Sequence, residues 1–80
     1  MRHELKLESC YYIAALDREK TFEVRYNGDR GFQKGDVVKF REYKKGRYTL
    51  NKFYATITYV TNYHQKEDWV VFGFRIHSEE

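Results

Sequence analysis

The sequence predicts an α+β domain in which one short helix lies beside a curled, mixed sheet of about five strands. Apolar and polar residues alternate with the period of a strand in several segments, whereas only residues 8–17 have the spacing of a helix. Glycine, asparagine and charged residues separate these segments and mark turns. The predicted order is one strand, one helix and four further strands, which favours a partly open barrel with the helix at its mouth.

Length and composition indicate a single domain that spans residues 1–80. Six Phe, eight Tyr and one Trp supply bulk for a small core. The net charge of +3 permits a nucleic-acid partner without requiring one. One cysteine excludes an internal disulfide, and there is neither an apolar leader nor a stretch long enough to span a membrane. We therefore expect a cytoplasmic protein that does not enter the membrane.

The first strand is predicted at residues 3–8, where the sequence HELKLE alternates. Leu5 and Leu7 fall on one side of this strand, and Glu4 and Lys6 fall on the other. Such alternation is typical of a strand with one face in the core and one face in solvent.

The helix is predicted at residues 8–17 because apolar residues recur there at i, i+3 and i+4. Tyr12, Ala15 and Leu16 occupy these positions and form one stripe that can face a core. Ser9 either caps the N-terminus of this helix or lies in its first turn.

The second strand is predicted at residues 21–26, where alternation returns and separates an apolar face from a charged one. The two faces are Phe22, Val24 and Tyr26 on one side and Thr21, Glu23 and Arg25 on the other. Residue types alone favour a solvated face with a weak ion pair. The alternative is a preorganised anion or base-edge site, in which Arg25 offers a planar fork, Glu23 orients it and Lys20 adds a mobile charge.

The rest of the chain reads as a loop at residues 27–36 followed by three strands. The second of these, at residues 52–60, places Phe53, Ala55, Ile57 and Tyr59 on one face. The last, at residues 68–77, is apolar throughout, which predicts a central or barrel-lining strand. Trp69 at its start is expected in the core, with a place in a ligand cleft as the alternative.

A basic hairpin is predicted around the turn KKGR, since residues 39–52 carry six basic side chains and one acidic one. Beside Tyr43 and Tyr48, these cations form a plausible surface for phosphate contacts and base stacking. An equally acceptable interpretation is the protection of an edge strand against aggregation. The candidate backbone contacts are Lys39, Arg41, Lys44, Lys45 and Arg47.

No metal site or cofactor is predicted. His3, His64 and His77 lack the close spacing of a metal motif, and one cysteine cannot complete a zinc site. The glycines fit neither a P-loop nor a dinucleotide-binding spacing. Cys10, on the predicted helix, is interpreted as a small packing residue and not as a nucleophile.

The segment REKTFEVR resembles the signature Gly-x-Lys-x-x-Glu-x-Arg of the ASCH domain (activating signal cointegrator homology). Lys20, Glu23 and Arg25 match this signature, and Arg18 stands where the glycine is usual. The segment DRGFQKGDVV is similar to the Phe-x-x-Gly-Asp turn that follows in this PUA-like superfamily. The turn residues are Phe32, Gly35 and Asp36. Nearly the whole chain resembles a compact bacterial and phage branch of unknown function.

This resemblance implies a PUA-like β-barrel with a cleft between barrel and helix, into which Lys20, Glu23 and Arg25 face. It also implies RNA binding, and we expect a non-enzymatic module that takes single-stranded RNA, or a flipped base or nucleotide, into the cleft. We expect Arg25 to contact phosphate or a base edge and Lys20 to contact phosphate, while Glu23 holds Arg25 or accepts from an exocyclic amine. Arg30 and Gln33 on the following loop are expected at the rim, with the basic hairpin guiding the backbone of the nucleic acid.

Two alternatives to RNA binding remain open at the level of sequence. Some ASCH proteins are amidohydrolases that deacetylate acetylated cytidine, and in that case Lys20 would be the nucleophile or base. Glu23 stands where those enzymes have threonine, which departs from their pattern. The other alternative is a protein-interaction module that uses the aromatic surface. If the usual glycine serves a positive φ angle, Arg18 must adopt a strained or shifted backbone.

Overall fold

The structure is a computed structural model that describes residues 1–28 and 30–77. One helix and five strands follow in the predicted order, so the small α+β fold is confirmed. The longest strand begins at Arg47, earlier than the predicted residue 52. The elements are β1 (Arg2–Glu8), α1 (Ser9–Leu16), β2 (Phe22–Tyr26), β3 (Val37–Lys44), β4 (Arg47–Thr61) and β5 (Trp69–Ile76).

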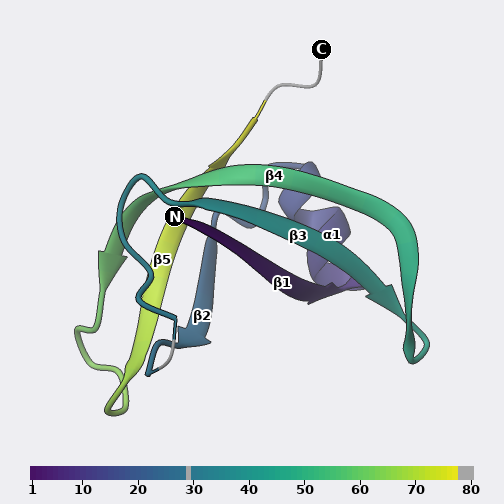
Figure 1. Ribbon diagram of the computed structural model, residues 1–80. Coiled ribbons are helices and arrows are strands. Elements are labelled where there is room, and N and C mark those ends of the chain that lie inside the picture. Colours follow the sequence, from purple (N-terminus) through teal and green to yellow (C-terminus); the bar gives the residue numbers. More distant parts are fainter. Residues whose placement is uncertain (29, 78–80) are drawn as a thin grey trace.

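The five strands form one mixed sheet in the order β1-β3-β4-β5-β2. The strands β1 and β3 run parallel, whereas the pairs β3–β4, β4–β5 and β2–β5 are antiparallel. The sheet curls into a half-barrel, with β1 and β2 as its two edges (Figure 1). The strand β5 lies between β4 and β2, which confirms the central position predicted for the last strand.

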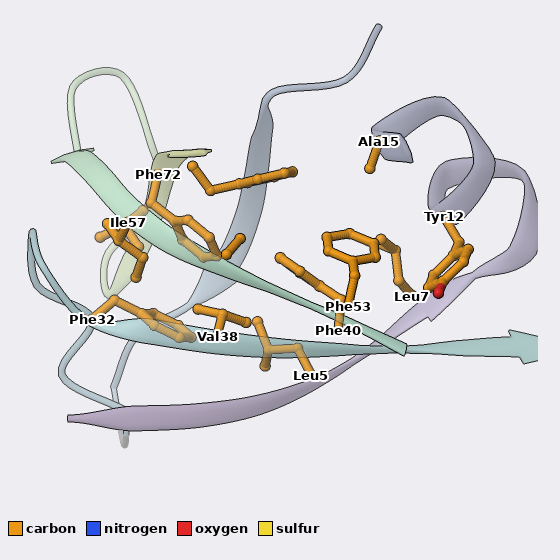
Figure 2. Close-up of a cluster of buried hydrophobic side chains, with 13 residues drawn as sticks. Leu5, Leu7, Tyr12, Ala15, Phe32, Val38, Phe40, Phe53, Ile57 and Phe72 are labelled. Atoms are coloured by element: carbon orange, nitrogen blue, oxygen red, sulfur yellow. The ribbon is translucent and has the colours of Figure 1, made fainter. Parts of the chain in front are cut away.

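The core fills the concave side of the curled sheet, and α1 contributes to it at one end (Figure 2). Tyr12 of α1 packs on Phe53, with 5.1 Å between ring centroids, and Phe53 packs on Phe40 at the same distance. The buried apolar residues are Leu5, Leu7, Tyr12, Ala15, Phe32, Val38, Phe40, Phe53, Ala55, Ile57, Val70, Phe72 and Phe74. Within the described ranges, no helix has the length and apolarity that a membrane span requires.

Two predictions for α1 are wrong. Leu16 was expected in the buried stripe with Tyr12 and Ala15, but it is exposed at the last helical position. Cys10 was expected to pack, but it is also exposed. An eight-residue helix makes little more than two turns, so only a narrow part of its surface reaches the sheet.

A bulge in β4 overturns the prediction that Tyr59 shares a face with Phe53, Ala55 and Ile57. The register between β4 and β5 shifts between Ile57 and Tyr59, so that Tyr59 lies opposite Gly73. One extra residue moves the following side chains to the other face of a sheet. Tyr59 is accordingly 66% exposed, whereas Ile57 is buried.

Glu42 is a buried carboxylate that joins the helix to the β3–β4 hairpin. It lies where the register between β3 and β4 shifts, between Arg41 and Tyr43. It accepts hydrogen bonds from Ser9 Oγ at 2.7 Å, Thr49 Oγ1 at 2.8 Å and Asn51 Nδ2 at 2.9 Å. These donors, Ser9 foremost, lower the pKa of Glu42. Ser9 is thus a residue of the first helical turn, the second of the two positions expected for it.

Arg18 ends the helix in the backbone conformation that glycine usually adopts. Its φ angle is +64°, which confirms the strained backbone expected at this position. The Arg18 N–H donates to Ala15 O at 3.0 Å, and the Glu19 N–H donates to Ala14 O at 2.9 Å. This pair of bonds is a Schellman motif, in which a left-handed residue follows the C-cap.

We expect Arg18→Gly to raise the free energy of unfolding by about 1 kcal/mol, because glycine has no Cβ to oppose a positive φ. In a domain of this size, that increase raises Tm by roughly 4–8 °C. The control is Arg18→Ala, which also loses the side-chain hydrogen bond to Leu16 O but keeps a Cβ. Thermal unfolding followed by circular dichroism tests this prediction, and a glycine variant no more stable than the alanine variant would contradict it.

The stability conferred by Glu42 should depend on pH. Its pKa in the folded state lies below 4.5, the ordinary value, so its contribution is complete above pH 4.5 and is lost as pH falls through the folded-state pKa. Denaturant unfolding of Glu42→Gln should therefore show lower stability than wild type at pH 7 and a shrinking difference below pH 4.5. Thr49→Val removes one donor to Glu42 and should weaken this pH dependence. A difference between Glu42→Gln and wild type that stays constant down to pH 3 would refute the assignment.

Candidate functional site

The two edge strands of the half-barrel border one cleft of about 540 Å³. The edge β1 supplies one wall and β2 supplies the other, while the start of α1, the loop after β2 and the first residue of β5 complete the lining. The lining residues are Leu5, Lys6, Leu7, Glu8, Tyr11, Glu23, Val24, Arg25, Tyr26, Arg30, Phe32 and Trp69. Cations, acids and aromatic rings therefore meet where the barrel is open.

Glu23 is the buried centre of a group of three charges, which we call the clasp: Lys20, Glu23 and Arg25. Glu23 Oε1 lies 2.9 Å from Lys20 Nζ, and its Oε2 accepts a hydrogen bond from Arg25 Nε at 2.6 Å. The Glu23 side chain is only 10% exposed, against 17% for Lys20 and 26% for Arg25. The charged face of β2 thus points into the half-barrel, and the solvated face that residue types alone favoured is not observed.

The cations of the clasp also cap backbone carbonyls at the open edges. The Asn27 N–H donates a hydrogen bond to Asp68 O just after β2. Because backbone groups alternate in direction along an antiparallel strand, the odd-numbered residues of β2 form the backbone hydrogen bonds to β5. The carbonyl of the even-numbered Phe22 therefore points away from β5. Lys20 Nζ donates to this Phe22 carbonyl at 2.6 Å. Arg25 Nη2 donates across the cleft to Lys6 O of β1 at 2.5 Å. Arg25 therefore connects the two edges of the sheet.

Arg30 adds a second contact of the same kind. Its Nη1 donates to Glu4 O at 3.3 Å. Glu4 precedes by two residues Lys6, whose carbonyl accepts from Arg25. The Val37 N–H donates a hydrogen bond to Met1 O, so the odd-numbered residues of β1 form the backbone hydrogen bonds to β3. The carbonyls of the even-numbered residues therefore point away from β3 and face the cleft. Two guanidinium groups thus occupy positions where a further strand would pair.

Aromatic rings line the cleft next to these cations. Tyr26 and Trp69 pack edge to face with 6.0 Å between ring centroids, and Tyr11 lies 5.7 Å from Lys20 Nζ. Trp69 is 38% exposed, so its expected place in the core is wrong and the alternative of lining a cleft holds. Sequence reasoning missed Lys6, Tyr11 and Tyr26, because only the order of strands brings these residues together.

Two predicted binding residues lie outside the cleft. Lys20 stands behind Glu23 and borders a different, smaller depression with Arg18 and Arg75. Gln33 is exposed on the loop and does not line the cleft. The structure therefore brings Glu23, Arg25 and Arg30 together at the cleft and leaves Lys20 and Gln33 beside it.

The turn Phe32-x-x-Gly35-Asp36 holds the loop against β1. Gly35 has a φ angle of +95°, which favours glycine. Asp36 Oδ2 accepts a hydrogen bond from the Gln33 N–H at 3.0 Å and lies 2.8 Å from His3 Nε2. Burial raises the pKa of Asp36, but hydrogen bonds from His3 and Gln33 outweigh burial and leave this pKa below its ordinary value.

The basic hairpin lies on the outer surface and takes no part in lining the cleft. Lys39 and Arg41 approach the carboxylate of Glu4, at 3.8 Å and 3.3 Å. The guanidinium of Arg41 also lies over the ring of Tyr48, at 4.1 Å from the centroid. The remaining predicted backbone contacts, Lys44, Lys45 and Arg47, are exposed at the tip of the hairpin.

A search of residues 1–28 and 30–77 finds no group of three or more His, Cys, Asp and Glu side chains that could hold a metal ion. Glu8 and Glu23 are the described carboxylates that line the cleft, and both oxygens of Glu23 already contact cations. What the arrangement offers chemically is hydrogen-bond donors, positive charge and aromatic surface within one opening.

Residues 2–74 match the model of a family described as a domain of unknown function, DUF3850, and the chain belongs to this family. The chain is also 35% identical over 68 residues to an uncharacterized 12.9 kDa protein in the GpA 3′ region of Escherichia phage P2. That alignment covers 85% of this chain and 59% of the phage protein. The chain thus spans less than two thirds of the length of this relative.

Glu23→Gln should destabilise the fold, because it leaves Lys20 and Arg25 without their shared anion in a largely enclosed position. We expect a loss of roughly 1–3 kcal/mol in the free energy of unfolding, less than for a fully buried pair. Glu4→Gln is the control, since Glu4 pairs with two cations on the exposed surface and should cost at most about 1 kcal/mol. Equal losses for the two variants in urea unfolding would rule out a special role of the clasp.

Proposed function

We propose that this DUF3850 domain is a PUA-like module of the ASCH type that binds single-stranded RNA, with one unstacked nucleotide in the cleft between β1 and β2. The observation that carries the proposal is the joint lining of this cleft by cations and aromatic rings: Lys6, Arg25, Arg30, Tyr11, Tyr26 and Trp69. Aromatic rings stack on unpaired bases, and guanidinium groups pair with phosphates. The volume of about 540 Å³ falls within the usual range for small-molecule sites, roughly 300–1,000 Å³.

Arg25 is the residue best placed to receive a phosphate. It donates to Glu23 through Nε and to Lys6 O through Nη2, and a guanidinium carries five N–H donors. A phosphate in the cleft can therefore meet Arg25 while Glu23 still fixes its orientation. Because both oxygens of Glu23 already contact cations, its role in the proposal is to position Arg25 and not to read a base.

The resemblance of the clasp to the ASCH signature supports the same proposal. Lys20 and Arg25 both contact Glu23, which lines the cleft, as residues of one functional unit would. The amidohydrolase alternative is less well supported, because it needs the amine of Lys20 at the substrate. That amine contacts Glu23 and Phe22 O, and Lys20 does not line the cleft.

Fluorescence anisotropy of a labelled single-stranded RNA, at low and at physiological salt, tests the proposal. Arg30→Ala should weaken binding about tenfold, as expected for loss of one charged hydrogen bond to phosphate, about 1.4 kcal/mol. Arg30 is preferred to Arg25 for this test because Arg25 also connects the sheet edges. Arg75→Ala, which removes an exposed arginine outside the cleft, is the matched control.

Wild-type protein that binds no RNA would refute the proposal. Equal weakening by Arg30→Ala and Arg75→Ala would also refute it, since general electrostatic attraction is then sufficient. Incubation with acetylated cytidine, followed by mass spectrometry, separates binding from hydrolysis. Loss of an acetyl group that depends on Lys20 would favour the amidohydrolase.

A further inference from the structure

The outward side of β2 is apolar and uncovered. Phe22 is 49% exposed, Val24 42% and Tyr26 48%, although alternation alone would place such residues in a core. Their side chains point outward because Glu23 and Arg25, on the other face of the strand, occupy the interior of the half-barrel.

The neighbouring strands extend this apolar side. In the β2–β5 register, Phe22 lies opposite Gly73, Val24 opposite Val71 and Tyr26 opposite Trp69. The bulge in β4 then places Tyr59 opposite Gly73 on the same side. Residues directly opposite each other in a sheet share a face. We call this surface the outer apolar face: Phe22, Val24, Tyr26, Tyr59, Trp69, Val71 and Gly73.

None of these seven positions carries a charged side chain. Cations border the face at one end: Lys20 Nζ, paired with Glu23, lies 4.5 Å from the centroid of the Phe22 ring, and the exposed Arg75 follows Gly73 by two residues on β5.

The helix does not cover the outer apolar face, because α1 contacts β1 and β3 at the opposite edge of the sheet. By contrast, the cleft and the basic hairpin gather cations. Most cations thus lie in the cleft and on the hairpin, although Val24, Tyr26 and Trp69 of the outer apolar face also line the cleft.

We propose that the outer apolar face is the interface of a homodimer. A face whose own side chains are uncharged suits a second copy, because a two-fold interface brings each residue near its own equivalent. The bordering Lys20 is already paired with Glu23 at 2.9 Å. Aromatic enrichment and depletion of charge are also the marks of an interface core. A nucleic acid would instead require cations on this face.

The size of the face agrees with this partner. Aromatic side chains present roughly 150–250 Å² each, so the exposed fractions of 38–66% amount to on the order of 500 Å² for the face. That area lies at the upper end of what monomers expose, about 300–600 Å². With a polar rim it approaches the roughly 800 Å² per partner of a standard interface.

Sedimentation velocity on nuclease-treated protein tests the dimer without bridging by nucleic acid. The molar mass obtained for wild type at tens of micromolar protein should be twice the 9.8 kDa of one chain. Tyr59→Asp, which places a charge on the outer apolar face without touching the cleft, should sediment at 9.8 kDa. The control is Leu50→Asp, which makes the same kind of change on β4 at a side chain that is 98% exposed, and it should remain dimeric.

A wild type that remains at 9.8 kDa overturns the proposal, as does a Tyr59→Asp variant that still dimerises. A monomeric Leu50→Asp would also overturn it, since the contact would then involve the hairpin. Circular dichroism establishes that each variant is folded. If Tyr59→Asp does not fold, Thr61→Asp replaces it, because Thr61 lies opposite Val71 on the same face.

Discussion

The buried carboxylate of Glu23 is the interaction on which the open side of this half-barrel depends. A sheet of five strands that curls without closing leaves backbone groups unpaired along two edges, which is a hazard for aggregation. Glu23 holds two cations, and each of them donates to an edge carbonyl: Lys20 to Phe22 O and Arg25 to Lys6 O. Side chains therefore supply part of the hydrogen bonding that a sixth strand would supply, and the space that this strand would fill remains a cleft.

Buried carboxylates also hold the strand β3 near both of its ends. Asp36 precedes β3 and contacts His3, while Glu42 lies near its other end and accepts three hydrogen bonds. The pKa values of Asp36 and Glu42 are both lowered, so protonation of either group at acid pH opposes folding. A domain of 80 residues buries a limited core, and polar groups with their partners satisfied add specificity to it.

Alternation predicted the strands but not which face of β2 points inward. A period of two places the side chains of Glu23 and Val24 on opposite faces of the strand, but it does not determine which face points into the barrel. That choice depends on β1 lying across the cleft, a tertiary arrangement between segments far apart in sequence. The bulge before Tyr59 could not be predicted from the sequence either, because the alternation of Phe53, Ala55, Ile57 and Tyr59 continues through it. The triplet Lys20, Glu23 and Arg25 was predicted as a site from its resemblance to the ASCH signature, whereas residue types alone favoured a solvated face.

The two faces of the strand β2 therefore contribute to two different surfaces of the molecule. Its odd-numbered side chains, Glu23 and Arg25, build the charged wall of the cleft, whereas Phe22 and Val24 belong to the outer apolar face. Because side chains on opposite faces of a strand do not contact each other, substitutions on one face can change one property and spare the other. Val24 and Tyr26 are exceptions, since with Trp69 they border both the cleft and the outer apolar face. Occupancy of the cleft and association of two copies would therefore be coupled mainly through these three side chains.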